Sequence, residues 1–280
     1  MDLWFTEQHT KNVRFSIRVD RQVYTRKSYY QQIDIFDTPE FGRILSLDGC
    51  LMITEKDEFI YHDMIVHVPM ATNPDIQSVL VIGAGDGGVI RELTRYPGIK
   101  KIHMVEIDEE VVNACRKYIP QTASSLDDDR VTIFFEDGLP FVRRRENEYD
   151  LIIVDSTDPF GPGEGLFTRE FYGNCYKALT ENGILVNQME TAFYDTYSDA
   201  LERAYVRVNK VFPVIKLYRA NIPTYPSGGW LFGYASKGID PLNIHEEWWR
   251  GLGIKTKYYN PEIHKAAFAM PNYITELLSD

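Results

Sequence analysis

From residue 78 onward, short apolar runs alternate with helical segments, and this rhythm constrains the fold more than any other feature. The first run, Val79-Leu80-Val81-Ile82, is continuous, as expected of a strand buried on both faces of a parallel sheet. Helices are predicted at 89–96 and 109–118, and further strands at 102–105, 131–135, 151–154, 184–186, 214–217 and 231–234. This alternation predicts an α/β fold with a Rossmann-like, doubly wound sheet.

The chain before residue 57 follows a different pattern. Between residues 13 and 54, apolar residues such as Phe15, Ile17 and Val19 alternate with polar ones, which is the period of a half-buried strand. We therefore predict a small antiparallel β domain of five or six strands over residues 1–56 and a Rossmann-like catalytic domain over 57–280. A helix with one apolar face is expected at 57–70. It ends before Asn73-Pro74, which is an alternative domain boundary.

Composition excludes several classes of protein. The 41 acidic and 30 basic residues give a net charge of −11, which argues against nucleic acid and permits a cationic ligand. Three cysteines without CxxC spacing predict neither a disulfide scaffold nor a zinc site. We identify no signal peptide and no apolar run of about 18 residues, so we expect no membrane segment and a cytoplasmic location.

A glycine turn, Gly83-Ala84-Gly85-Asp86-Gly87-Gly88, joins the first strand to the first helix of the Rossmann-like domain. Glu106 follows about 20 residues later at the end of the next strand, where an acid can accept ribose hydroxyls of a nicotinamide or an adenosyl ligand. Asp86 separates these two ligands, because its carboxylate would repel a pyrophosphate and attract an ammonium or sulfonium group. Asp86 could instead cap the following helix, and the two roles can coexist.

Acids follow four consecutive strands of the predicted sheet. They are Asp86, Glu106, Asp137 before Gly138, and Asp155 with Asp158. Open α/β sheets bind ligands at the carboxyl ends of their strands, so this cluster should repel anions and hold a polycation. The following segment, residues 160–165, is rich in glycine and proline and fits either a mobile lid or an ordinary surface loop.

These motifs together give the chain a specific resemblance, over nearly its whole length, to the spermidine synthases, the putrescine aminopropyltransferases of the polyamine synthase family. The segments that carry it are Tyr30-Gln31, residues 57–62, residues 81–88, residues 105–108, Asp155-Ser156-Thr157-Asp158-Pro159, Gly161-Pro162, residues 222–228, residues 257–260 and residues 264–268. The resemblance implies the S-adenosylmethionine-dependent transferase type of Rossmann-like fold. It also implies transfer of an aminopropyl group from decarboxylated S-adenosylmethionine to putrescine, giving spermidine and methylthioadenosine.

The resemblance implies a role for each matching residue. Methylthioadenosine would be held by Gln31, Glu106, Asp137, Gly138 and, from the loop, Pro162. Asp86 would bind the terminal amine of the donor, and Asp155 would accept the proton of the attacking amine. The acceptor channel would be lined by Tyr61, His62, Asp155, Asp158, Glu190, Tyr225 and Trp4. The decarboxylated donor would be a co-substrate, with no prosthetic group and no metal, in a homodimer or homotetramer built through the N-terminal β domain.

Two segments depart from the family pattern. Ala84 stands where many relatives have glycine, and its methyl group is tolerable if its backbone angles are ordinary. Asn187-Gln188-Met189-Glu190 differs from the usual Gln-Thr-Glu type, which leaves the role of Glu190 less certain.

Three other functions remain open at this point. An N-methyltransferase that uses intact S-adenosylmethionine on putrescine could share the scaffold. A non-catalytic polyamine-binding or nucleoside-binding protein could retain the same pocket. A nicotinamide oxidoreductase is disfavoured by Asp86. Within the aminopropyltransferases, cadaverine, agmatine or spermidine could replace putrescine as acceptor.

Intact S-adenosylmethionine carries a carboxylate that would meet Asp86, whereas the decarboxylated donor presents only an amine on that arm. We therefore expect Asp86→Asn to weaken donor binding and to reduce discrimination against intact S-adenosylmethionine. A competition assay between the two donors measures this, and unchanged selectivity would contradict the assignment.

Overall fold

Seven strands form the central sheet of the computed structural model, which describes residues 2–156 and 165–279. Their order is β12-β13-β11-β10-β7-β8-β9. The five strands from β11 to β9 run parallel, and β13 runs antiparallel to both of its neighbours, β11 and β12. The predicted doubly wound α/β fold is confirmed. The bounds are β7 Ser78–Gly83, β8 Lys101–Glu106, β9 Val131–Phe135, β10 Tyr149–Asp155, β11 Leu179–Gln188, β12 Val214–Asn221 and β13 Gly229–Ser236.

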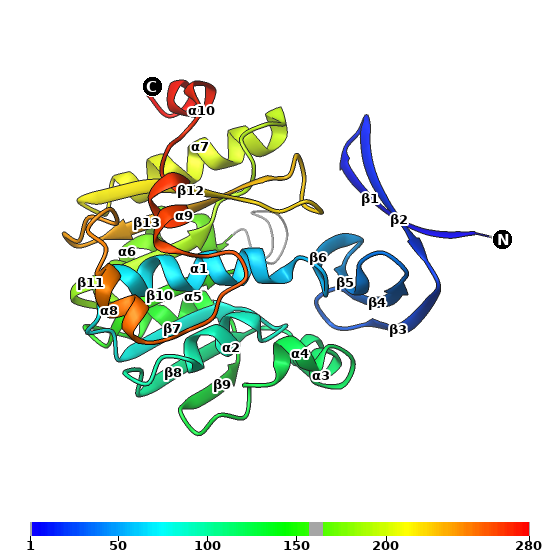
Figure 1. Cartoon of the computed structure of the whole chain (residues 1–280), viewed down its shortest axis with the longest axis horizontal. Helices are drawn as coiled ribbons and strands as arrows, with labels where there is room; N and C mark the ends of the chain where they lie inside the picture. Colours follow the sequence, from blue (N-terminus) through cyan, green and yellow to red (C-terminus); the bar gives the residue numbers. More distant parts are fainter. Residues whose placement is uncertain (1, 157–164, 280) are drawn as a thin grey trace.

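Helices cover both faces of this sheet (Figure 1). Alternate residues of each strand enter different cores: Val79 and Val81 of β7 pack with α1, α2 and α3, whereas Leu80 and Ile82 pack with α5 and α6. The helices are α1 Glu58–Thr72, α2 Gly88–Thr94, α3 Glu109–Tyr118, α4 Pro120–Ala123, α5 Gly138–Arg143, α6 Arg169–Ala178, α7 Asp195–Asn209, α8 Glu246–Gly251, α9 Pro261–Ala267 and α10 Asn272–Leu277.

Helix α1 differs from its prediction. It was expected to have one apolar face, but all of its residues except Phe59 are buried, including the charged Glu58, His62 and Asp63. A helix buried on every side needs partners for its charged groups. Asp63, for example, accepts three backbone N–H groups from residues 257–259 at 2.8 to 3.2 Å.

The N-terminal region contains six strands in two sheets. β3 Arg21–Lys27, β4 Gln32–Thr38, β5 Gly42–Leu47 and β6 Cys50–Thr54 form a four-stranded antiparallel sheet. β1 Leu3–Thr10 pairs with β2 Val13–Val19 in a hairpin that projects from the body of the molecule (Figure 1). β1 was not predicted. Its inward positions are Phe5, Glu7 and His9, so polar residues occupy the places where the alternation should be apolar.

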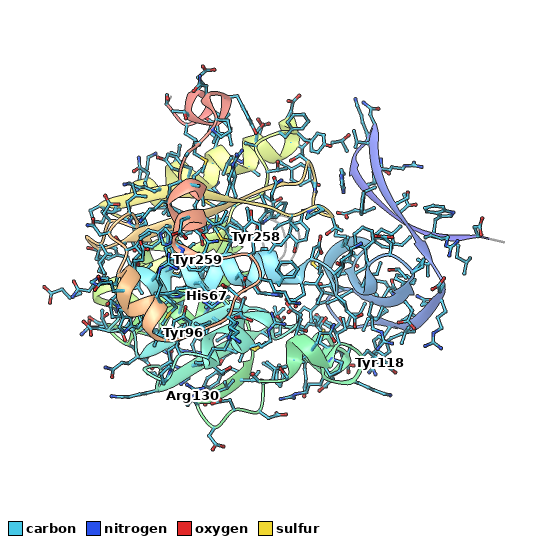
Figure 2. The ribbon with its side chains drawn as sticks, in the orientation of Figure 1. His67, Tyr96, Tyr118, Arg130, Tyr258 and Tyr259 are labelled. Atoms are coloured by element: carbon cyan, nitrogen blue, oxygen red, sulfur yellow. The ribbon has the colours of Figure 1, made fainter. Side chains whose placement is uncertain are left out.

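Polar contacts dock the four-stranded sheet against the Rossmann-like domain. Tyr118, labelled in Figure 2, ends α3. Arg43 donates to its carbonyl at 2.6 Å, and the centre of its ring lies 5.0 Å from that of Tyr24. Ser28 and Gln31 both donate to Oδ2 of Asp108, at 2.6 and 3.0 Å. The two regions therefore share hydrogen bonds with buried or half-buried partners, and their relative position is fixed close to β8.

Within the described residues, no helix is long and apolar enough to cross a membrane.

Candidate active site

The chain changes direction across the sheet between β7 and β10. After β7 it continues to β8 and β9 on one side, and β10 and β11 then lie on the other side. Ligands bind to open α/β sheets at such a switch point, beside the carboxyl ends of the strands. Here Gly83 ends β7 opposite Asp155, which ends β10. A Cβ on Gly83 would lie 2.0 Å from the backbone oxygen of Asp155, so only glycine allows this approach.

Ala84 adopts a less ordinary conformation than expected. Its φ is +64°, in the left-handed region where a non-glycine residue costs roughly 1–2 kcal/mol. Two hydrogen bonds hold it there: its N–H donates to the carbonyl of Asp155 at 2.9 Å, and its carbonyl accepts the N–H of Gly87 at 2.9 Å. The methyl group is accommodated because the turn fixes the backbone, and not because the backbone angles are favourable.

The four strand-end acids that the structure describes line one cavity. These are Asp86, Glu106, Asp137 and Asp155, and Gln31, Tyr61, His62, Gly138 and Tyr225 line it with them. Asp158 and Pro162 lie outside the described residues. The capping alternatives also apply, because Asp86 accepts the N–H of Gly88 at 2.8 Å and Asp137 accepts that of Leu139 at 2.9 Å. Capping uses one oxygen of each carboxylate and leaves the other available to a ligand.

One half of the cavity is formed by the end of β8 and the N-terminal sheet. Glu106 accepts the N–H of Asp108 at 2.9 Å, and Asp108 in turn accepts the amide of Gln31, so these three side chains are positioned together. Burial raises the pKa of Glu106 to about 7. Gly138 packs against Ile82, where a Cβ would lie 2.5 Å from Cγ2. The acids of this half can accept hydrogen bonds from hydroxyl groups, and the backbone at Gly138 can be approached closely because it carries no side chain.

The other half of the cavity combines carboxylates with aromatic rings. The hydroxyl of Tyr61 donates to Oδ1 of Asp155 at 2.5 Å, and that of Tyr225 donates to the carbonyl of Met52 at 2.6 Å. The two rings lie 6.0 Å apart. Burial and the charge of Asp86 raise the pKa of Asp155 to about 6, against the opposing effects of His62 and Tyr61. Apolar walls with acids inside them fit an alkyl chain that carries amines.

His62 joins this half from helix α1. Its Nε2 lies 3.3 Å from Oδ1 of Asp86, and its Nδ1 lies 2.5 Å from Oε2 of Glu58. Burial disfavours a charged ring, but Asp86 and Glu58 outweigh this effect and raise the pKa of His62 to about 10. At neutral pH His62 therefore carries a positive charge among the acids.

Neither Trp4 nor Glu190 is among the described residues that line the cavity. Trp4 is 59% exposed, whereas Glu7, on the opposite face of the same strand, lines the cavity. Glu190 is 1% exposed with φ +70°, and Gln188, which donates to it at 3.4 Å, lines the cavity. The period of a strand over residues 3–10, which places Phe5, Glu7 and His9 on one side, is the signal that could have identified Glu7.

Two groups in the described part of the chain bring metal-ligating atoms within 4.8 Å of one another: His62, Asp86 and Asp155 in the cavity, and Asp63, His67 and Glu92 in the core. Protein donors already contact these carboxylates, such as the Tyr61 hydroxyl on Asp155 and the Arg91 and Arg95 guanidinium groups on Glu92. We assign a metal to neither group.

The raised pKa of Glu106 predicts a pH-dependent cost to stability. Below the unfolded pKa of 4.5, Glu106 is neutral in both the folded and the unfolded protein, and its burial costs no stability. As the pH rises through about 7, the buried carboxyl must become charged, and the free energy of unfolding falls. Glu106→Gln keeps an acceptor for Asp108 and removes the charge. We expect the variant to be more stable than the wild type by up to about 3 kcal/mol at pH 8 and equal to it at pH 4. Denaturant unfolding at both pH values measures this, and a variant that is less stable at pH 8 would contradict it.

Known families and structures match this chain over most or all of its length. Residues 58–247 match the spermine/spermidine synthase domain, and residues 3–55 match the spermidine synthase tetramerisation domain. Polyamine aminopropyltransferases from Clostridium perfringens and Alkaliphilus oremlandii are 66% and 63% identical, over 100% and 99% of this chain and 99% and 98% of theirs.

Two solved structures have the same fold. A spermidine synthase in complex with the transition-state analogue AdoDATO has a TM-score of 0.96, and the spermidine synthase from Thermotoga maritima has one of 0.94. Both are 44% identical to this chain, and each match covers 99% of it and 94% of the other chain. The chain therefore belongs to the spermine/spermidine synthase family of aminopropyltransferases.

Proposed function

We propose that this aminopropyltransferase moves the aminopropyl group of decarboxylated S-adenosylmethionine to putrescine, giving spermidine and methylthioadenosine, with Asp155 as proton acceptor. The observation that carries the proposal is the position of Asp155. It ends β10 against the glycine turn, its carboxyl accepts the Tyr61 hydroxyl, and one of its oxygens lies within 4.8 Å of ligating atoms of His62 and Asp86. These contacts support Asp155 as the proton acceptor, because they hold its carboxyl beside the glycine turn and the aromatic half of the cavity.

The donor would extend across both halves. Gln31, Glu106, Asp137 and Gly138 would hold the nucleoside, and Asp86 the terminal amine. A related spermidine synthase has been solved with the transition-state analogue AdoDATO, which supports this class of donor. Pro162 would contact the nucleoside and Asp158 the acceptor, as the family resemblance implies.

The acceptor would lie along the aromatic half, between Tyr61, His62 and Tyr225. One amine of putrescine attacks the carbon next to the sulfonium, a C–N bond forms, and the C–S bond breaks with its electron pair passing to sulfur. A primary alkylamine is mostly protonated at pH 7, and making it neutral costs roughly 4 kcal/mol. A carboxylate at the attacking nitrogen can accept that proton. The raised pKa of Asp155 suits it to this role, since it retains the proton better than an exposed aspartate would.

Product mass tests the proposed reaction. The enzyme is incubated with putrescine and either decarboxylated or intact S-adenosylmethionine. We expect spermidine and methylthioadenosine from the decarboxylated donor. An N-methylated diamine formed from the intact donor would indicate a methyltransferase, and tight binding without turnover would indicate a binding protein. Rates with cadaverine, agmatine and spermidine then define the acceptor.

The role of Asp155 predicts a specific kinetic loss. Asp155→Asn keeps the size of the side chain and its contact with Tyr61 but cannot accept a proton. We expect kcat to fall by about 10²- to 10⁴-fold, the usual contribution of a general base. Binding of methylthioadenosine, measured by calorimetry, should be unchanged. A loss of less than fivefold in kcat would show that another group or water accepts the proton.

The match of residues 3–55 to a tetramerisation domain supports a homo-oligomer, which we propose is built through the N-terminal strands.

A further inference from the structure

A chain of ionic contacts leads away from the cavity through His62. Asp86 faces Nε2 of the ring at 3.3 Å, and Glu58 contacts Nδ1 at 2.5 Å. Glu58 lies one helical turn before His62 in α1, and Arg91 of α2 donates to both of its oxygens at 2.9 Å. A paired guanidinium–carboxylate contact fixes the plane of the carboxylate as well as its position. Glu58 is thus a rigid acceptor behind the imidazole.

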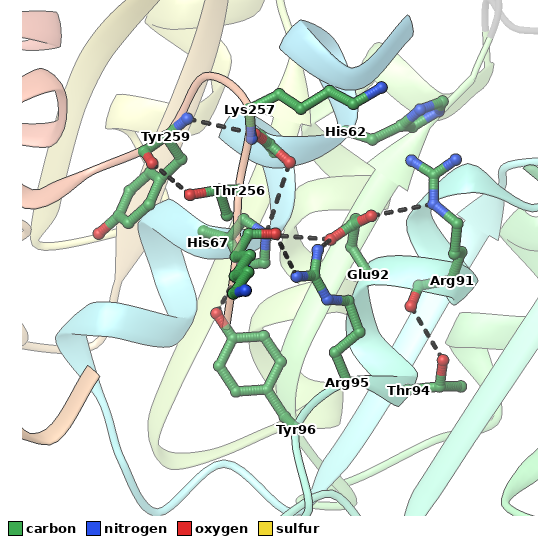
Figure 3. A network of polar contacts seen from close by, with 12 residues as sticks. His62, His67, Arg91, Glu92, Thr94, Arg95, Tyr96, Thr256, Lys257 and Tyr259 are labelled. Carbon is green, nitrogen blue, oxygen red and sulfur yellow. Dashed lines mark hydrogen bonds and ion pairs between the residues drawn. The ribbon is translucent and has the colours of Figure 1, made fainter. Parts of the chain in front are cut away.

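Arg91 is itself restrained from other directions. Its Nε donates to Glu92 at 2.9 Å, and its Nη1 donates to the carbonyl of Gln121 at 3.2 Å. Glu92 also contacts Nε2 of His67 at 3.1 Å and the guanidinium of Arg95, as the dashed lines in Figure 3 show. All of these groups are buried or half-buried, so the contacts are exposed to little solvent screening. The position of Arg91 therefore does not depend on Glu58 alone.

Packing removes the remaining freedom of the His62 ring. Gly88, the first residue of α2, lies against it so closely that a Cβ would be 2.2 Å from Cε1 and 2.3 Å from Nε2. The imidazole is 1% exposed. Its Nε2 has no hydrogen bond in the described structure, and the ion pair with Asp86 is the contact it makes. This nitrogen belongs to a side chain that lines the cavity, so its orientation matters for any amine bound there.

We propose that Glu58 and Arg91 are positioning residues for the amine end of the site, acting through His62. Glu58 accepts the Nδ1–H of the ring, and Arg91 holds Glu58 in the plane that this bond requires. Nε2 is then the nitrogen that faces Asp86 and the substrate amine. The inference rests on the proposed function, in which His62 and Asp86 contact the amines.

The hydrogen bond from Nδ1–H to Glu58 determines which edge of the ring a cationic substrate meets. As an imidazolium, His62 forms the ion pair with Asp86 and occupies the place of a ligand cation. When an ammonium group binds Asp86, the ring releases its Nε2 proton to solvent, the Nδ1–H tautomer remains, and the lone pair on Nε2 faces the ammonium. If Glu58 did not hold Nδ1, the ring could instead present an N–H to the same cation, which would oppose binding.

Glu58→Gln tests the proposal, since it keeps the size of the side chain and breaks the paired contact with Arg91. We expect KM to rise at least tenfold both for decarboxylated S-adenosylmethionine, whose terminal amine Asp86 would bind, and for putrescine, which His62 would contact. The Kd of methylthioadenosine, which carries no amine on that arm, should change by less than twofold. Arg91→Lys keeps the charge and loses the paired geometry, and it should give a smaller change in the same direction. Asp150→Asn is the control. Asp150 accepts the N–H groups of Gln77 and Ser78 at the opposite end of β7, so this variant should lose stability without a change in KM.

Nitrogen NMR of His62 gives a readout that does not depend on turnover. In the unliganded wild type the Nδ1 signal should be that of a protonated, strongly hydrogen-bonded nitrogen, and in Glu58→Gln it should move toward that of an exchanging ring. Wild-type protein that shows the predicted His62 signal but makes no spermidine would contradict the proposed function alone. An unchanged KM and an unchanged His62 signal in Glu58→Gln, or equal losses for putrescine and methylthioadenosine, would overturn the positioning role.

Discussion

The pairing of β7 with β10 is the constraint on which the rest of the site depends. It places the Cα of Gly83 against the carbonyl of Asp155, and the N–H of Ala84 then donates to that carbonyl. The same contact turns the chain into α2 and carries Asp86 to the cavity. A backbone hydrogen bond between two adjacent strand ends thus links the turn expected to hold the donor with the aspartate proposed to accept the proton. Because the link is made by backbone atoms, side-chain rotations leave it unchanged.

The carboxylates in and around the cavity differ in the positive charge that the protein places beside them. Asp155 and Glu106 have raised pKa values because they are buried near other acids, whereas Arg91 and His62 counter burial and lower the pKa of Glu58 to about 2. Among the residues that the structure describes, His62 is the cation beside the carboxylates that would touch substrate, through its ion pair with Asp86 and its charge near Asp155. Glu58 and Glu92, which contact His62 and His67 and would not touch substrate, are paired with arginine. A cationic ligand would supply further positive charge to the carboxylates that would touch substrate.

The sequence allowed the sheet and most of the cavity to be predicted, because both depend on local patterns. Continuous apolar runs identify buried parallel strands, and acids that follow such strands meet at one edge. Three features were not predictable in this way. β1 carries Glu7 and His9 on its inward side, and α1 buries charged residues whose partners come from α2 and from residues 257–259. The left-handed φ of Ala84 follows from a bond to a strand about 70 residues later. In β1 the local strand period is present but its inward positions are polar, whereas the features of α1 and Ala84 depend on tertiary contacts that have no local signal.

The cavity wall formed by the N-terminal sheet has a consequence for how this chain can change over evolution. Gln31 reaches the site from one region, and Asp108, which holds its amide, comes from the other. Ser28 shares the same carboxylate oxygen. An N-terminal sheet taken from another protein would have to bring both donors in register with this acceptor, or the nucleoside half of the cavity would be incomplete. Neither region can therefore be exchanged alone. A substitution on one side of their border is expected to be accompanied by a matching substitution on the other side.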